Sequence, residues 1–108
     1  MNHVDIHAMR NAADRASHFL RSLANADRLM LLCQLSQGEM GVGDLEAVTG
    51  IRQPSLSQQL GILRREGLIQ PRKLGKQVFY SIAEPKVLVM VQQLYDLFCD
   101  NPAEEARA

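Results

Sequence analysis

Two short segments joined by a tight turn constrain the fold of this chain more than any other feature of its sequence. The first, Asp44–Thr49, has the length of a short helix and is closed by Gly50, a residue that easily adopts the left-handed conformation found after helix ends. Pro54 suits the first turn of a longer helix that extends to Gly67. Three leucines at helical spacing give this longer helix one apolar face: Leu56, Leu60 and Leu63. Together the two segments predict a helix-turn-helix.

A β-hairpin is predicted directly after the helix-turn-helix. Leu68–Leu74 and Gln77–Ile82 are extended runs, and the dipeptide Gly75-Lys76 between them has the composition of a short hairpin turn. We therefore expect a two-stranded β-wing beside the longer helix, as in a winged helix-turn-helix.

Two helices are expected before this unit. Apolar residues recur at helical spacing over residues 6–23, which predicts an amphipathic first helix. Either Asn25 or Asp27 can cap a second helix, which is expected to end near Gln37 because Gly38 follows.

A last helix is expected to begin near Glu84-Pro85 and to reach Cys99. Its sequence is more apolar than that of a terminal helix surrounded by solvent, so we expect it to pack on another chain. The predicted fold is thus mainly α, with five helices and a two-stranded β-wing, in one domain over residues 1–108 that forms a homodimer. Residues 1–5 and 101–108 are expected to be frayed ends.

Charge is segregated along the chain although the formal net charge is +0. Residues 1–50 and 83–108 are net acidic, whereas residues 51–82 carry Glu66 alone against six basic residues: Arg52, Arg64, Arg65, Arg72, Lys73 and Lys76. A basic stretch between acidic flanks is typical of a protein that presents one face to nucleic-acid phosphates. Double-stranded DNA is therefore the expected partner.

The polar side chains opposite the leucine face are the candidates for reading base edges. Glutamine can form two hydrogen bonds with adenine in the major groove, and a serine hydroxyl can either donate or accept a hydrogen bond. We expect contacts to DNA from Gln53, Ser55, Ser57, Gln58, Gln59 and Arg65 of the longer helix and its turn, and from Arg72, Lys73, Lys76 and Gln77 of the wing. The alternative for any one of them is an ordinary solvated surface residue.

Several other classes of protein are disfavoured. The N-terminal residues lack the features of a signal peptide and no apolar run approaches the length of a membrane span, so a cytoplasmic protein without membrane contact is expected. Two cysteines are too few for a sulfur-only zinc site and, in a reducing compartment, are either buried thiols or a switch. No activating base lies near either cysteine in the sequence, so we expect no enzyme activity.

Five segments together resemble the ArsR/SmtB family of winged-helix repressors: Leu23–Leu29, Val42–Leu45, Gln53–Leu60, Leu63–Ile69 and Val78–Ile82. The resemblance implies dimerisation through the first and last helices and binding to a pseudo-palindromic operator. One departure is Gln58-Gln59, where many members of the family have a histidine in one of the two positions, and it leaves the operator sequence open.

The ligands of the family's metal sensors are missing from the corresponding positions. Arsenic and cadmium sensors carry Cys-Val-Cys where this chain has Gly41-Val42-Gly43, and zinc and nickel sensors carry histidines in the last helix, where Val87–Asp100 has none and only Asp96 and Asp100 are acidic. We expect no metal and no cofactor. A metal-sensing repressor remains an alternative, but its site would have to be built from the two cysteines or from His3, His7 and His18, which we expect at the surface.

The two cysteines, Cys33 and Cys99, stand in contexts similar to those of the persulfide- and redox-sensing branch of the family, which includes BigR, SqrR and HlyU-type regulators. The resemblance implies that the two thiols of one subunit face each other and are joined by a disulfide or a longer sulfur bridge when oxidants or reactive sulfur species arrive. Cys99 is expected to be the more exposed thiol because it ends a helix. A HlyU-like role as activator or anti-repressor is a further alternative, and the sequence names neither the regulated genes nor the physiological inducer.

Overall fold

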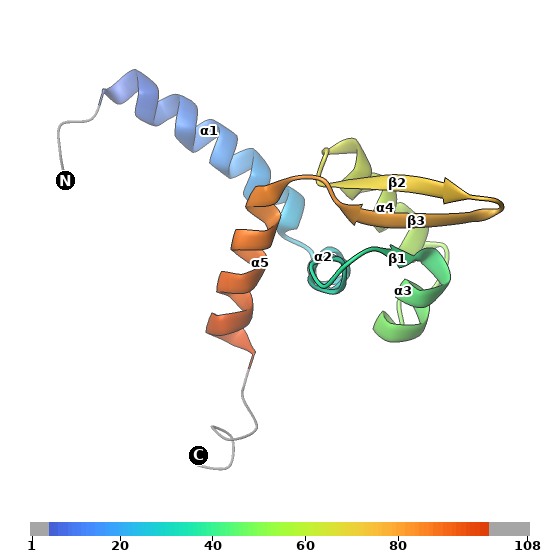
Figure 1. The fold of residues 1–108 in the computed structure, drawn as a ribbon. Coiled ribbons are helices and arrows are strands. Elements are labelled where there is room, and N and C mark those ends of the chain that lie inside the picture. The colour runs from blue at the N-terminus through green and yellow to red at the C-terminus, as the bar shows by residue number, and fades with distance from the viewer. Residues whose placement is uncertain (1–4, 100–108) are drawn as a thin grey trace, which may run out of the picture.

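The computed structural model describes residues 5–99, which form five helices and three short strands (Figure 1). In chain order the elements are α1 (Ile6–Leu23), α2 (Ala26–Leu35), β1 (Met40–Gly41), α3 (Val42–Thr49), α4 (Ser55–Arg65), β2 (Ile69–Leu74), β3 (Gln77–Ile82) and α5 (Pro85–Phe98). The predicted winged helix-turn-helix is confirmed, with the wing formed by β2 and β3. None of the helices in the described part of the chain is long and apolar enough to cross a lipid bilayer.

Polar side chains fix the starts of the outer helices. The Asp5 carboxylate accepts a hydrogen bond from the His7 backbone N–H at 3.0 Å and caps α1, although the sequence predicts a frayed N-terminal end that includes Asp5. Of the two candidate caps of α2, Asn25 is the one used, and it accepts from the Arg28 N–H at 3.0 Å. The Glu84 carboxylate caps α5 by accepting from the Lys86 N–H. The remaining predicted frayed residues, 1–4 and 101–108, lie outside the described part of the chain.

The helix-turn-helix consists of α3 and α4. Gly50 ends α3 with a φ of 74°, as its place after the short helix predicts. α3 begins at Val42, earlier than the expected Asp44, because the chain enters it directly from β1. The leucine face of α4 is buried against the core, with Leu56 and Leu63 fully inaccessible and Leu60 nearly so. Its opposite face is left toward solvent.

A third strand, β1, corrects the expectation of an isolated two-stranded hairpin. The sheet order is β1-β3-β2 and both pairings are antiparallel, so β3 is the central strand. Gly41 lies opposite Phe79 in the register, and a Cβ on Gly41 would stand 3.3 Å from the Phe79 ring. The β1–β3 pairing thus anchors the wing to the body, while β2 is an edge strand that contains Pro71.

The outer helices α1 and α5 extend away from the body formed by α2, α3, α4 and the sheet (Figure 1). In α1 only Ser22 and Leu23, in its last turn, are buried. α5 buries Val87 and Val91 against the core and leaves much of its apolar surface uncovered. An 18-residue helix that buries so little of itself is marginal in water, because most helix stability in proteins comes from packing.

Candidate nucleic-acid interface and thiol pair

The outward face of α4 presents several of the predicted DNA contacts together. Ser57, Gln58 and Arg65 are exposed on this helix, and Arg64 beside them is exposed as well. Arg64 belongs to the basic stretch of residues 51–82 but is not among the residues that the sequence predicts to contact DNA. Hydroxyl, amide and guanidinium groups on one exposed helix face supply donors and acceptors for base edges and phosphates.

Three other predicted contacts of this region have partners inside the protein. Ser55 and Gln59, one turn apart, are half-buried and face the start of α2: the Ser55 hydroxyl donates to Asp27 at 3.4 Å, and Arg28 donates to the Gln59 amide oxygen at 3.0 Å. The Gln53 amide oxygen accepts from the backbone N–H of Ser57 at 3.0 Å, so it satisfies a free donor in the first turn of α4.

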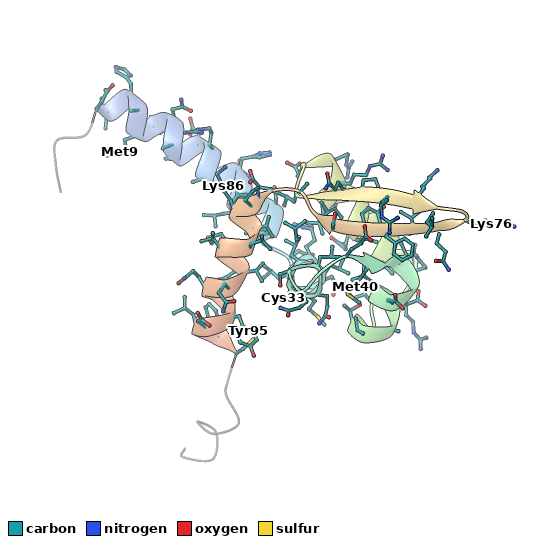
Figure 2. The ribbon with its side chains drawn as sticks, in the orientation of Figure 1. Met9, Cys33, Met40, Lys76, Lys86 and Tyr95 are labelled. Atoms are coloured by element: carbon teal, nitrogen blue, oxygen red, sulfur yellow. The ribbon has the colours of Figure 1, made fainter. Side chains whose placement is uncertain are left out.

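The wing carries its exposed basic charge toward its tip. Lys73, Lys76 and Gln77 are exposed, and Lys76 lies at the end of the hairpin (Figure 2). Their positions suit contact with phosphates beside the groove that α4 would enter.

Arg72, the fourth predicted wing contact, is exposed but interacts with other groups of the protein. Its guanidinium donates two hydrogen bonds to the Glu39 carboxylate, at 2.9 and 2.7 Å, and lies 5.2 Å above the centre of the Phe79 ring. The hydrogen bond from Arg72 lowers the pKa of Glu39 below its ordinary value. Nothing in the local sequence signals this pair, because the two residues are distant along the chain. The side chain of Arg72 thus ties β2 to the segment that leads into β1.

Cys33 lies where α2 and α5 approach each other, and Cys99 follows the last turn of α5. Cys33 is half-buried on α2, and Cys99, the C-cap residue of α5, is exposed as predicted. Burial raises the pKa of the Cys33 thiol, and the negative charge of a Cys99 thiolate raises it further. A pocket of about 720 Å³ opens beside Cys33 between the two helices and is lined on the α5 side by Leu88, Val91, Gln92 and Tyr95. Figure 2 labels Cys33 and Tyr95 on these two helices.

Metal ligands do not come together in the described part of the chain. Over residues 5–99 no three His, Cys, Asp or Glu side chains are grouped so that they could hold a metal ion. His7 and His18 are exposed, and His18 Nε2 lies 2.6 Å from a carboxylate oxygen of Glu66. His3 lies outside the described residues.

The helix-turn-helix, its polar outward face and the anchored basic wing define a winged helix-turn-helix DNA-binding protein. Residues 25–70 match the profile described as "Bacterial regulatory protein, arsR family". The chain belongs to this ArsR family of transcriptional regulators and is not an enzyme.

Three relatives illustrate the similarity. The biofilm growth-associated repressor of Agrobacterium fabrum is 47% identical over 89% of this chain and 82% of its own length. The crystal structure of the transcriptional repressor BigR from Xylella fastidiosa has 43% identity and a TM-score of 0.79, over 88% of this chain and 94% of that one. Reduced HlyU from Vibrio cholerae has 36% identity and a TM-score of 0.82, over 88% of this chain and 100% of that one. The curated HlyU sequence of that organism is described as a transcriptional activator.

Proposed function

We propose that this protein is a dimeric transcriptional repressor that leaves its operator when reactive sulfur species or oxidants join Cys33 to Cys99. The observation that carries the proposal is that the half-buried Cys33 thiol of α2 lies close enough to Cys99, at the exposed end of α5, for a Cys99 thiolate to raise the pKa of Cys33. Similarity to the repressors of Agrobacterium fabrum and Xylella fastidiosa supports repression as the outcome of DNA binding.

Binding to DNA is assigned to α4 and the wing. In this proposal α4 enters the major groove, where Ser57 and Gln58 contact base edges. Arg65, Lys73, Lys76 and Gln77 contact phosphates on either side. Gln53, Ser55, Gln59 and Arg72 stay predictions as DNA contacts, and the partner that each has within the protein makes it a weaker candidate.

Dimerisation is assigned to α1 and α5, because their uncovered apolar side chains need a partner surface. These exposed residues are Ile6, Met9 and Leu20 on α1 and Leu88, Val89, Tyr95, Leu97 and Phe98 on α5. So large an apolar surface is unusual for a monomer of this size. A second copy of the chain would cover it and place two α4 helices on the two halves of a pseudo-palindromic operator, about 34–36 Å apart or at a multiple of that spacing.

The sensing reaction begins at Cys99 in this proposal, because an exposed thiol is accessible and the pKa of Cys33 is raised by burial. The Cys99 thiolate attacks the outer sulfur of a persulfide RSSH and releases the thiol RSH, leaving Cys99 as a persulfide. Cys33 then attacks the Cys99 sulfur, forms the disulfide and releases hydrogen sulfide. The sum is RSSH plus two protein thiols giving RSH, H₂S and one disulfide, so RSSH is reduced while the two thiols are oxidised.

A longer bridge forms if a second RSSH first extends the Cys99 persulfide by one sulfur and releases another RSH. Attack by Cys33 on the middle sulfur then expels H₂S and leaves three sulfur atoms between the two β-carbons. The pocket of about 720 Å³ beside Cys33 supports this variant, because it offers room for the inserted atom.

Bridging would affect DNA binding through the helices that carry the cysteines. α2 contacts α4 through the Asp27–Ser55 and Arg28–Gln59 hydrogen bonds, and α5 belongs to the proposed dimer surface. Linking α2 to α5 would shift α4 relative to the dimer axis. A coupling of about 1–3 kcal/mol would lower operator affinity roughly 5- to 150-fold.

The test measures DNA binding of the reduced protein and of protein treated with an organic persulfide, hydrogen peroxide or oxidised glutathione. The probe is a duplex that the reduced wild-type protein selects from a randomised pool. We expect treatment to weaken binding in the wild type, dithiothreitol to restore it, and mass spectrometry to find an internal link between Cys33 and Cys99.

Cys33→Ser and Cys99→Ser are matched controls for each other, because each keeps one thiol. Both should bind DNA when reduced and neither should release it on treatment. Normal release by either variant would eliminate the bridge, and release by both would point to modification of a single thiol or of another group.

The similarity to HlyU favours a second reading, in which the same protein increases transcription by displacing another DNA-binding protein. Transcription in vitro separates the two. A promoter with the selected site should be silenced by the reduced protein alone if the protein is a repressor. It should be unaffected until a competing DNA-binding protein is added if the HlyU-like reading is right.

A further inference from the structure

Arg28 connects three helices with one guanidinium group. Its Nε donates to the carbonyl oxygen of Ser22 at 2.7 Å and one terminal nitrogen donates to the carbonyl of Arg21 at 3.2 Å, both in the last turn of α1. The other terminal nitrogen donates to the side chain of Gln59 on α4 at 3.0 Å. Arg28 itself belongs to the first turn of α2.

The contacts at α1 suit arginine for a physical reason. The last carbonyls of a helix lack partners within the helix and carry partial negative charge, so a cation that donates to them stabilises the helix end. A guanidinium holds its N–H groups in one rigid plane, so fixing two of them on α1 also fixes the direction of the third. That third donor meets Gln59, and the position of α4 is thereby tied to the end of α1.

A second contact ties α4 to α1 farther along its length. Glu66, the C-cap residue of α4, lies 2.6 Å from Nε2 of His18 on α1. At a rise of about 1.5 Å per residue, Gln59 and Glu66 are about 10 Å apart along the helix axis. Two ties at this separation restrict the direction of α4 as well as its position. We call the Arg28–Gln59 and His18–Glu66 contacts together the helix clamp.

We propose that the helix clamp, with Arg28 as its positioning residue, sets the spacing and relative orientation of the operator half-sites that the dimer accepts. The inference rests on the proposed function, in which α1 forms part of the dimer surface and α4 enters the major groove. Because the clamp connects these two helices within each protomer, it fixes the distance between the two α4 helices of the dimer.

DNA spacing is a sensitive reporter of this geometry. Inserting one base pair between the half-sites moves one of them by about 3.4 Å along the axis and rotates it by roughly 34° about the axis. A dimer with a rigid α1–α4 connection cannot adjust to both the shift and the rotation of one half-site without losing contacts there. A dimer whose α4 can reorient follows them with little loss.

The experiment compares two duplexes, the one that the reduced wild-type protein selects from a randomised pool and the same duplex with one base pair inserted at its centre. We expect the wild type to bind the selected duplex about tenfold or more tightly, comparable to the effect of a mismatched base pair. In Arg28→Met the ratio should fall to about two. In Arg28→Lys it should be intermediate, since lysine keeps the charge and lacks the planar fork.

Arg21→Met is the matched control. It removes the same charge from a neighbouring position, where the Arg21 side chain donates to Ser17 within α1 and has no hydrogen bond to α4. It should keep the wild-type ratio. Unchanged thermal unfolding and sedimentation would establish that a changed ratio in Arg28→Met does not come from unfolding or dissociation.

Gln59→Met tests the other end of the contact and remains informative if Arg28→Met does not fold. If Gln59 holds the clamp, the variant lowers the ratio between the two duplexes as Arg28→Met does. If Gln59 instead reads a base, the variant weakens binding to both duplexes by the same factor, the ratio is unchanged and the clamp is refuted.

The remaining outcomes separate this inference from the proposed function. A wild type that discriminates the two duplexes, with Arg28→Met and Gln59→Met both keeping its ratio, would refute the clamp alone. A wild type that selects no site with two half-sites would overturn the dimeric operator binding and the clamp with it.

Discussion

Val89→Glu is the sharpest test of the dimer surface. Val89 lies on α5, is 62% exposed in the protomer and lines a pocket between α1 and α5 together with Phe19 and Met90. Replacing it should therefore leave the protomer folded while placing a carboxylate at the proposed interface.

The expected size of the effect follows from this exposure. Burying a whole valine side chain contributes about 1.5–3 kcal/mol. If the partner covers the 62% that is exposed, the contribution is about 1–2 kcal/mol per copy and about 2–4 kcal/mol for the two copies of a symmetric interface. The dimer dissociation constant should rise roughly 30- to 1,000-fold, and more if the glutamate is buried while charged.

Sedimentation equilibrium over a range of concentrations measures this constant, and circular dichroism checks the fold. Val48→Glu is the matched control, because Val48 is similarly exposed, at 56%, but lies on α3 away from both outer helices. A Val89→Glu protein that dissociates no more readily than Val48→Glu would refute the assignment of the dimer surface to this part of α5.

Three further predictions concern stability and DNA binding. Leu63→Ala should lower the free energy of unfolding by about 2–5 kcal/mol in chemical denaturation, because Leu63 is fully buried on the core-facing side of α4. Leu74→Ala, at an exposed wing position, should change this free energy little. Because the pKa of Glu39 is lowered in the folded protein, its ionised form stabilises the fold above the ordinary glutamate pKa of about 4.3. This contribution is lost as the pH falls through the lowered pKa. Glu39→Gln lacks it at every pH and should therefore show a shallower loss of thermal stability on acidification than the wild type. Lys76→Ala should weaken binding to all duplexes and flatten the salt dependence of binding, whereas Gln58→Ala should change the preference among operator variants by about 1–3 kcal/mol. Salt titrations that show no difference between the two variants would contradict the assignment of Lys76 to phosphates and of Gln58 to bases.

The order of the helices and the wing could be predicted because their signals are local. Three signals act within a few residues of the structure that they predict: the helical spacing of the leucines in α4, Gly50 at the end of α3 and Gly75 in the hairpin turn. β1 escaped prediction because its two residues are too few to show a strand pattern, and it is defined only by pairing with β3.

The candidate site was predictable only as far as one helix face or one hairpin could be considered alone. Ser57, Gln58 and Lys76 are exposed as expected because no other element covers them. Gln59 and Arg72 bind groups that are distant in the sequence, Arg28 and Glu39, and only the folded arrangement brings those groups near. Tertiary hydrogen bonds of this kind leave no periodic signal.

The proline in β2 has a consequence for crowded DNA. An edge strand that projects from the body presents unpaired backbone groups, which invite strand-to-strand association with a neighbouring molecule. Pro71 removes one backbone donor from this edge, and Lys73, two residues farther along β2, adds a charge that repels an identical strand. In the proposed function, dimers bound side by side on neighbouring sites can therefore bring their wings together without nucleating a continuous intermolecular sheet. The strand that is proposed to lie beside DNA also resists aggregation when the protein is concentrated along DNA.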